Sequence, residues 1–418
     1  MSLNFFKSKK SPEETLCVLP WIHLFILPSG KVLQCCNTSD YINGAGDINE
    51  ESIEEIWNGK YMKSIRKQMM QGVEPKICCH CFDNERAMGT SLRNSQNRNY
   101  PDLLPRIPEI TKKNGYLDKM DLKIWDFRFS NLCNYKCRMC NPDNSSAWVA
   151  DYKKLGWPVS EDYTEHTRIE SVNKYSNTDF IKKYIDSVEQ INFAGGESLI
   201  IDEHWQILDL LDKNQRYDVR LGYNSNMSVL KYKDKNVLDY WVKWGRRLLL
   251  MASVDEFGPR AELIRSGTKW GVVEANLKAV NEIGIELRPY ITVSAMNVFR
   301  LPEILDYFIE IGIIKQEENW MNFELNVLYG PPKLHVSILP DEMRRKIKHR
   351  LEKYITNYQR EYNADISRHF QYLFTHLNKP WQKKYLLEFR DFSLSLDKIR
   401  DEDTLATIPE LVGLFDDK

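Results

Sequence analysis

FSNLCNYKCRMCNPDNSS, residues 129–146, places three cysteines close together: Cys133, Cys137 and Cys140. This C-x3-C-x2-C spacing is short enough for three thiolates to converge on one metal centre. Structural zinc sites and fully ligated four-iron clusters normally take four protein ligands, whereas a site that must bind a substrate or cofactor keeps one position open. The stretch therefore indicates a metal centre with one open position. The alternatives are a zinc knuckle completed by a distant fourth ligand, and reduced cysteines in a core.

The chain around this stretch alternates short β-like segments with longer segments of helical periodicity. The expected strands, rich in aromatic and branched residues, are KIWDFRFS (123–130), QINFAGG (190–196), VRLGYNS (219–225), RLLLMASVD (247–255), ELRPYITVSA (286–295) and NFELNVLY (322–329). The expected helices between them are TDFIKKYIDSV (178–188), HWQILDLLDK (204–213), VLDYWVKWG (237–245), VVEANLKAVNEIG (272–284) and LPEILDYFIEIG (301–312).

This order predicts parallel strands with right-handed crossovers, and six such units are too few to close the usual eight-unit barrel. We therefore expect an α/β fold, a partial (β/α)6 TIM-like barrel, over residues 121–330. The three-cysteine stretch directly follows its first strand. Chemistry in such folds lies where strands end and loops begin.

The flanking segments are different in character. Residues 1–120 predict a small α+β module: HLFILPSGKVLQCC (23–36) indicates a hairpin with its turn at PSG. SIEEIWNGKYMKSIRKQMMQG (52–72) carries an apolar helical face. Residues 331–418 are charged and predict a helical C-terminal extension.

Composition and charge limit the function. The chain has 418 residues, 58 basic and 59 acidic, so its formal charge of -1 provides no global field for nucleic acid or an anionic membrane. Residues 1–16 lack an apolar core of signal-peptide length, and no apolar run is long enough to span a bilayer. Nine cysteines in short-spaced groups argue against a secreted disulfide framework. We expect a cytoplasmic metalloprotein.

The cysteine loop after the first strand of a (β/α)6 pattern resembles the radical S-adenosylmethionine (SAM) enzymes. In that family three cysteines hold three irons of a [4Fe-4S] cluster, and the amino and carboxylate groups of SAM chelate the fourth. An electron from the cluster then cleaves SAM to methionine and a 5'-deoxyadenosyl radical, which abstracts hydrogen from a substrate. The resemblance assigns Cys133, Cys137 and Cys140 to the cluster. Met139 departs from the family, which usually has an aromatic residue there, although its thioether can still pack against adenine.

The resemblance also implies contacts to SAM from the ends of later strands. NFAGGESLI resembles the family's Gly-Gly-Glu segment, where bare backbone approaches the methionine moiety, and YNSNMS, ASVDEFG and AELIRSG match further positions near SAM. The implied contacts are Gly195, Gly196, Glu197, Asn224, Asn226, Ser253, Asp255 and Arg265. An arginine there commonly pairs with the SAM carboxylate. The alternatives are an ordinary strand-to-helix turn at the glycines and a solvated arginine on a helix surface.

The other six cysteines resemble a twitch module, the shortened form of the SPASM module that carries an auxiliary iron–sulfur cluster, expected to be [4Fe-4S]. The Gly-x-Val-x-x-Cys hairpin and Cys-x-x-Cys pair carry the resemblance, which implies the ligands Cys17, Cys35, Cys78 and Cys81. Cys36 and Cys79 remain alternative ligands, and a four-thiolate zinc site needs the same ligand count. SPASM modules most often follow the barrel, whereas this one precedes it.

The resemblance implies a flavodoxin or ferredoxin as electron donor and favours a peptide or protein side chain as substrate. The alternatives are a small-molecule substrate such as a sugar or nucleotide, and a non-catalytic zinc or iron–sulfur binding protein. Residues 1–16 are too few for the winged-helix module that grips leader peptides in some relatives. The sequence does not indicate which substrate is used or how many subunits assemble.

Overall fold

The computed structural model describes residues 10–41, 43–159, 167, 171–172, 175–317 and 320–415. Residues 1–9, part of the segment used above to argue against a signal peptide, lie outside them. The chain forms two compact units. The first comprises Met1–Ser130, Arg168–Phe193 and Asp202–Arg220, and the second comprises Asn131–Thr167, Ala194–Ile201 and Leu221–Lys418. The boundaries expected at residues 120 and 330 stay a prediction.

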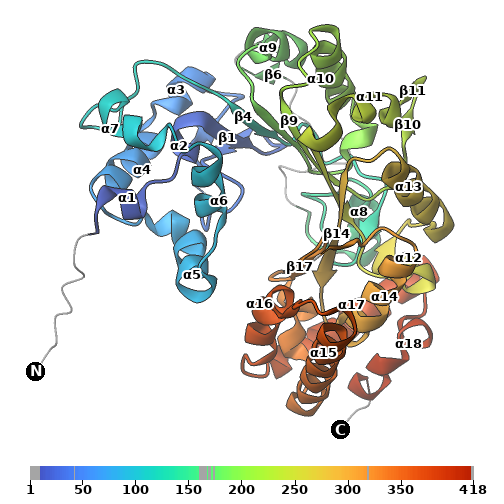
Figure 1. The fold of residues 1–418 in the computed structure, drawn as a ribbon. Coiled ribbons are helices and arrows are strands. Elements are labelled where there is room, and N and C mark those ends of the chain that lie inside the picture. Colours follow the sequence, from blue (N-terminus) through green and yellow to red (C-terminus); the bar gives the residue numbers. More distant parts are fainter. Residues whose placement is uncertain are drawn as a thin grey trace, which may run out of the picture. The chain divides into compact units, whose positions relative to one another are not determined.

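The first unit combines a small sheet with short helices, coloured blue to cyan and green in Figure 1. Its helices are α1 (Pro12–Thr15), α2 (Leu19–Ile22), α3 (Ile53–Trp57), α4 (Lys60–Met70), α5 (Cys79–Met88), α6 (Leu92–Asn99), α7 (Ile107–Ile110), α9 (Asn177–Tyr184) and α10 (Asp202–Lys213). Its strands are β1 (His23–Ile26), β2 (Lys31–Leu33), β3 (Gly46–Asp47), β4 (Ile124–Phe127), β6 (Ser171–Val172), β7 (Tyr175–Ser176) and β8 (Gln190–Phe193).

The predicted hairpin is present as β1 and β2, which pair antiparallel. Gly30 supplies its turn with φ +92°, a conformation that side-chain-bearing residues rarely adopt. The expected helix at 52–72 is divided into α3 and α4 because a capping box between Ser52 and Glu55 starts the first, and the Asn58–Gly59 step separates it from the second.

One pairing was not expected from the sequence. β1 pairs parallel with β4, so that His23 lies opposite Ile124 and Ile26 opposite Phe127. β4 in turn pairs parallel with β8. The hairpin that leads to Cys35 therefore extends the sheet to which the first expected barrel strand belongs.

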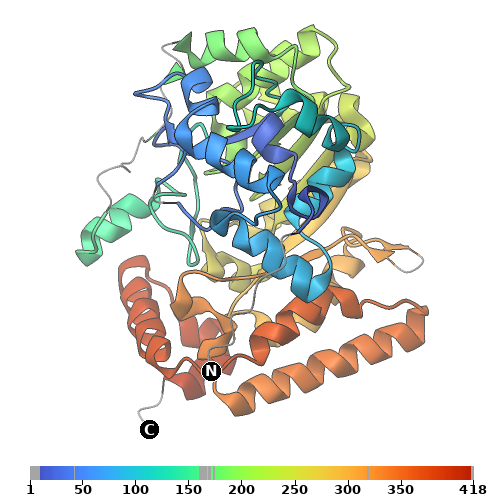
Figure 2. The same cartoon turned by 90° about the vertical axis from the view of Figure 1, so that its left-hand side faces the viewer.

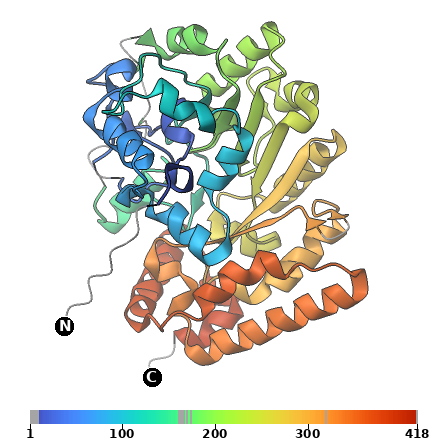
Figure 3. The same ribbon diagram turned by 60° about the vertical axis from the view of Figure 1, so that its left-hand side comes forward.

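The second unit contains four longer parallel strands and most of the longer helices. Its strands are β5 (Lys136–Cys137), β9 (Arg220–Ser225, from Leu221 onward), β10 (Lys231–Tyr232), β11 (Lys235–Asn236), β12 (Leu248–Ser253), β13 (Arg265–Ser266), β14 (Glu286–Val293), β15 (Gln316–Glu317), β16 (Trp320–Met321) and β17 (Glu324–Val327). β9, β12, β14 and β17 pair in chain order, all parallel, and Figure 3 shows them side by side in yellow-green to orange.

The helices of this unit are α8 (Trp148–Leu155), α11 (Val237–Trp244), α12 (Gly258–Ile264), α13 (Trp270–Glu282) and α14 (Leu301–Glu310). The periodicity predicted α11, α13 and α14, whereas α8 and α12 were not expected. Successive β-strands with helices between them confirm the predicted α/β class with parallel strands. The predicted helical C-terminal region contains α15 (Asp341–Tyr362), α16 (Ser367–Leu377), α17 (Lys383–Arg400) and α18 (Thr404–Thr407). Figure 2 shows the long α15 along its length.

Within the described part of the chain, none of the helices has both the length and the apolar character needed to cross a membrane.

Candidate metal centres

The three cysteines of residues 129–146 lie in one tightly held loop of the second unit. Cys137 pairs with Arg265 in the short antiparallel ladder of β5 and β13. The Cys137 carbonyl accepts two hydrogen bonds, from the Cys140 backbone N–H at 2.9 Å and from the Trp148 indole N–H at 3.0 Å. Backbone pairing on one side and a buried indole on the other therefore fix the turn between the second and third cysteines.

The thiols of this loop influence one another electrostatically. Burial raises the pKa of Cys133, Cys137 and Cys140, to about 12 for Cys140, and proximity to Cys137 raises the pKa values of the other two further. Two donors already face the sulfurs: the Tyr135 backbone N–H lies 3.5 Å from Cys133 Sγ, and Arg265 Nη1 lies 3.8 Å from Cys137 Sγ. Three neighbouring thiols, two of them with an N–H donor, fit a cluster bound as thiolates, because metal ions remove the repulsion between the charged sulfurs.

The Gly-Gly-Glu segment packs directly against the cysteine loop. Gly195 and Gly196 have φ values of +84° and +56°, and a Cβ at Gly196 would lie 2.2 Å from the Leu132 carbonyl oxygen. The Glu197 backbone N–H donates to that same oxygen at 2.8 Å. Only glycine allows this approach, so the segment fixes the start of the cysteine loop.

The Glu197 side chain is buried and bound within the protein. One carboxylate oxygen accepts from the Ser225 hydroxyl at 2.9 Å, and the other accepts from the Asn226 backbone N–H at 2.7 Å. Burial raises the pKa of Glu197 to about 7. The Asn226 side chain donates to Asn134 of the cysteine loop at 3.0 Å. These residues join the end of β9 to the loop.

Asp255 and Arg265 form a bidentate ion pair with each other. Arg265 Nε and Nη2 lie 2.7 Å and 3.0 Å from the two Asp255 carboxylate oxygens. The Thr292 backbone N–H also donates to Asp255 at 2.7 Å. Asp255 therefore orients the guanidinium toward Cys137, and the arginine is a half-buried, paired group rather than the solvated arginine considered above.

Three further predicted contacts, Met139, Asn224 and Ser253, lie in the same unit. Met139 lies half-buried in the loop. Asn224 and Ser253 lie on the half-exposed face of β9 and β12, where Asn224 is opposite Met251. The same face continues on β14 with Arg288 and Tyr290 and is called here the polar sheet face, defined by the residues Asn224, Met251, Ser253, Arg288 and Tyr290.

Sequence reasoning missed the role of Arg138, which lies between two of the loop cysteines. Arg138 is fully buried, and its Nη2 lies 2.6 Å from Asp397 and 2.7 Å from Glu402, both in the C-terminal helical region. Nearby, Arg400 Nε lies 2.8 Å from Asp151, and its Nη1 donates to the Lys136 carbonyl at 3.1 Å. A charged residue between cysteines was the only signal in the sequence, and its partners lie about 260 positions away.

Four cysteines of the first unit line one small cavity of about 20 Å³. They are Cys17, Cys35, Cys78 and Cys81, contributed by the segment before α2, the end of the hairpin and the start of α5. Burial, with a smaller contribution from Cys81, raises the pKa of Cys17 to about 12. Cys17 and Cys81 in turn raise the pKa of Cys78. The four thiols predicted as ligands thus face one space.

The alternative ligands lie outside this cavity's lining. Cys36 is exposed and its thiol lies beside Asp126, while Cys79 lies at the start of α5. His23 on β1 is not a lining residue either, and its Nδ1 lies 3.1 Å from the Ile124 carbonyl oxygen of the paired strand β4.

Polar side chains in the cavity wall suit a sulfur-rich group. Asn37 Nδ2 donates to Cys81 Sγ at 3.2 Å, and Arg93 lies close enough to lower the pKa values of Cys17 and Cys78. The Nε2 of Gln34 is buried without a hydrogen-bond partner among the described residues. A set of four thiols, donors and a cation fits an iron–sulfur cluster, whose sulfurs accept hydrogen bonds.

Among the described residues, no group of three or more His, Cys, Asp or Glu side chains is placed to hold a metal ion. Each cysteine of a four-iron cluster binds a different iron atom, so cluster ligands lie farther apart than the ligands of one zinc ion.

Residues 17–82 match the model of SPASM, an iron–sulfur cluster-binding domain. The matched range contains all four cysteines of the cavity, and the match confirms the predicted iron–sulfur module at the start of the chain. A comparison with curated proteins found no match.

The chain is also similar to several solved structures. A hexahistidine-tagged anSMEcpe with bound AdoMet has 15% identity and a TM-score of 0.40, with 58% of this chain and 62% of that chain covered. Streptococcus suis SuiB bound to S-adenosylmethionine has 14% identity and a TM-score of 0.36, with coverage of 73% and 64%. SuiB bound to precursor peptide SuiA has 13% identity and a TM-score of 0.35, with coverage of 84% and 70%. The chain thus spans less than two thirds of the first two structures.

Proposed function

We propose that this protein is a radical SAM enzyme with a [4Fe-4S] cluster on Cys133, Cys137 and Cys140. The observation that carries the proposal is the cysteine loop itself: its three thiols are close enough to raise one another's pKa values, and the Glu197 backbone N–H of the Gly-Gly-Glu turn donates to the Leu132 carbonyl at 2.8 Å. Three ligands leave one iron open for SAM. When bound, the cluster supplies the electron that cleaves SAM to methionine and a 5'-deoxyadenosyl radical, which abstracts hydrogen from the substrate.

The chain's own residues hold this centre in place. Gly195 and Gly196 leave backbone uncovered beside the loop, where the methionine moiety of SAM binds in our proposal. Asp255 orients Arg265, whose Nη1 faces Cys137, and Arg265 is the residue that would bind the SAM carboxylate in our proposal. Such fixed positions matter because a primary radical must form within contact distance of its target and away from water.

The other predicted residues are proposed to contact the ribose or adenine of SAM, or to position residues that do. Asn224 and Asn226 are proposed ribose partners at the end of β9, and Ser253 lies at the end of the neighbouring β12. Glu197 positions Asn226 through its backbone N–H. Met139 is proposed to pack against adenine.

We propose that Cys17, Cys35, Cys78 and Cys81 ligate an auxiliary [4Fe-4S] cluster. Their common cavity, the N–H···S bond from Asn37 and the match to an iron–sulfur domain over residues 17–82 support this assignment. The auxiliary cluster is proposed to take an electron from the substrate radical or to anchor the substrate pocket.

The proposed substrate is a peptide or protein side chain. The polar sheet face supports a polar, charged substrate, since Arg288 and the neighbouring Glu324 place opposite charges there, with 3.6 Å between Arg288 Nη1 and Glu324 Oε1. A flavodoxin or ferredoxin is the proposed electron donor. The nine free cysteines suit a reducing compartment, and we propose the cytoplasm.

Metal analysis of matched variants tests this proposal. After anaerobic iron and sulfide reconstitution, the unmodified protein is expected to hold about eight irons, and each variant that removes one cysteine set is expected to hold about four. The variants replace Cys133, Cys137 and Cys140, or Cys17, Cys35, Cys78 and Cys81, by alanine. Zinc in place of iron in either set would contradict the assignment of that set. Circular dichroism of each variant shows whether the fold persists.

A further inference from the structure

Gln34 lies in the wall of the first unit's cysteine cavity, directly before Cys35 and after strand β2. Only 1% of the residue is exposed. A primary amide carries one acceptor oxygen and two N–H donors, and buried polar groups normally have partners. A donor or acceptor of the Gln34 amide that lacks a partner would therefore indicate a group that binds in this cavity.

The acceptor side of the amide is occupied. The Tyr61 hydroxyl on α4 donates to Gln34 Oε1 at 2.8 Å. Burial raises the pKa of Tyr61 to about 12, so the hydroxyl keeps its proton at neutral pH and remains a donor. With its oxygen bound to Tyr61, the amide directs its nitrogen the other way. That Nε2 is buried and has no hydrogen-bond partner among the described residues.

The side chains of Asn37 and Arg93, which also line the cavity, have hydrogen-bond partners for their N–H groups. Asn37 donates to Cys81 Sγ. Arg93 is bound by Glu85 and by the Leu16 carbonyl, with Nε at 2.9 Å from Glu85 and Nη1 at 2.7 Å from Leu16. Within the described cavity wall, Gln34 thus holds an unused donor next to four cysteines, where a sulfur acceptor would satisfy it.

We propose that Gln34 Nε2 donates a hydrogen bond to a sulfur of the auxiliary cluster and that Tyr61 holds the amide in this orientation. This inference rests on the proposed auxiliary cluster. An N–H···S bond stabilises the reduced state, which carries one more negative charge, and hydrogen bonds to the sulfurs are among the factors that set a cluster's potential. Gln34 and Tyr61 are therefore positioning residues that raise the reduction potential of this cluster.

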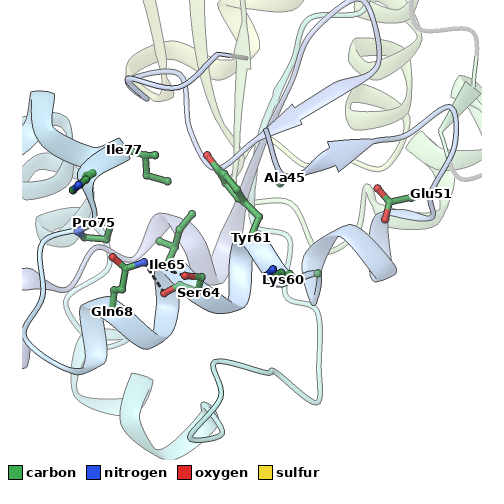
Figure 4. A pocket seen from close by; sticks show the side chains of 11 residues that line it. Ala45, Glu51, Lys60, Tyr61, Ser64, Ile65, Gln68, Pro75 and Ile77 are labelled. Atoms are coloured by element: carbon green, nitrogen blue, oxygen red, sulfur yellow. Dashed lines mark hydrogen bonds between the residues drawn. The ribbon is translucent and has the colours of Figure 1, made fainter. Parts of the chain in front are cut away.

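Tyr61 also lines a second hollow on the first unit. Figure 4 shows this hollow, with Tyr61, Ser64 and Gln68 among the residues that line it. Gln68 Nε2 donates to the Ser64 hydroxyl at 3.0 Å and to the Ser64 carbonyl at 3.3 Å. Gln68 is thus a glutamine of the same unit whose amide is bound on its own helix, and it serves as the matched control.

The test measures the midpoint potential of the auxiliary cluster alone. The parent is the full chain with Cys133, Cys137 and Cys140 replaced by alanine, which removes the other cluster. Gln34→Leu, Tyr61→Phe and Gln68→Leu are made in this parent, and each is titrated in a spectroelectrochemical cell after its iron and sulfide are counted.

Gln34→Leu is expected to shift the potential to a more negative value, because reduction loses a stabilising hydrogen bond. Tyr61→Phe is expected to shift it in the same direction by a smaller amount, and Gln68→Leu to leave it unchanged. Equal potentials for the parent, Gln34→Leu and Tyr61→Phe at equal iron content would overturn this inference alone. A parent that binds no iron in this unit would overturn the proposed auxiliary cluster as well. If Gln34→Leu fails to fold, the Tyr61→Phe result decides.

Discussion

Replacement of Arg138 by methionine should loosen the cysteine loop from the C-terminal helical region. Arg138 is fully buried and forms ion pairs with Asp397 and Glu402 at 2.6 Å and 2.7 Å. Methionine keeps much of the apolar stem and removes the charge. The change leaves two carboxylates facing an apolar side chain, although Asp397 keeps hydrogen bonds from the Thr404 backbone and hydroxyl.

The expected cost follows from this burial. Removal of one partner from a buried ion pair costs about 3–5 kcal/mol. The two carboxylate side chains are 15% and 16% exposed, so water compensates part of the loss. We therefore expect the lower end, about 3 kcal/mol, which corresponds to an increase of roughly 100-fold in the equilibrium constant for opening the loop.

Hydrogen exchange of the loop amides measures this opening directly. A global unfolding free energy is unsuitable because a two-unit metalloprotein does not meet the two-state condition. The informative amides are those of Arg138 and Cys140, bonded to the carbonyls of Ile264 at 2.8 Å and Cys137 at 2.9 Å. Their exchange in Arg138→Met should accelerate by roughly 100-fold if they exchange through this opening.

Two comparisons make the result decisive. Arg350→Met removes an exposed ion pair with Glu303 in the same unit and should leave the loop amides unchanged. Adding Asp397→Asn and Glu402→Gln to Arg138→Met removes the uncompensated charges and should restore part of the protection. Loop amides in Arg138→Met that exchange within about threefold of the unmodified rate would refute the reasoning.

Three further predictions concern separate parts of the chain. Cys35→Ala should lower iron bound to the first unit, whereas Cys36→Ala should not, as iron counts in the two variants will show; equal iron in both would contradict the cavity assignment. Gly196→Ala places a Cβ 2.2 Å from a backbone oxygen of the cysteine loop at φ +56° and should reduce iron in the second unit, with unchanged iron as the contrary result. Burial lowers the pKa of His335 to about 4 and of His376 to about 3, so below pH 6.5 the unfolded chain binds more protons than the folded one and stability falls. The stability advantage of the unmodified protein over the double variant His335→Gln and His376→Gln is read locally, from hydrogen exchange of the α16 amides corrected for the intrinsic exchange rate at each pH. This advantage should shrink from pH 7 to 4.5, and a constant advantage would contradict the lowered pKa values of these histidines.

The sequence allowed much of the fold to be predicted because local patterns determine it. Enrichment in aromatic and branched residues predicted strands such as β14, and glycine after helical periodicity marked the end of α13 within two residues. The helix break at Gly59 was missed because one apolar face continues across it. The parallel pairing of β1 with β4 joins segments about 100 residues apart, and no local pattern records such a pairing.

In the candidate site, too, local sequence predicted some residues, whereas the roles of others depend on three-dimensional packing. Spacing identified the three-cysteine loop, and a resemblance, rather than chemistry, selected Cys35 over its neighbour Cys36; the structure places only Cys35 in the cavity lining. The Asp255–Arg265 pair and the ion pairs of Arg138 depend on long-range packing, so their partners could not be predicted. Gln34 could not be recognised either, since an unpartnered amide is a property of three-dimensional surroundings.

Formation of 5'-deoxyadenosine tests the central claim most directly. The anaerobically reconstituted protein is mixed with SAM and dithionite, and the products are separated by chromatography beside a Cys137→Ala variant whose fold is checked by circular dichroism. We predict 5'-deoxyadenosine from the unmodified protein and none above background from the variant. Equal product from both proteins, or none from an unmodified protein that holds its full iron content, would contradict a radical SAM centre at this loop.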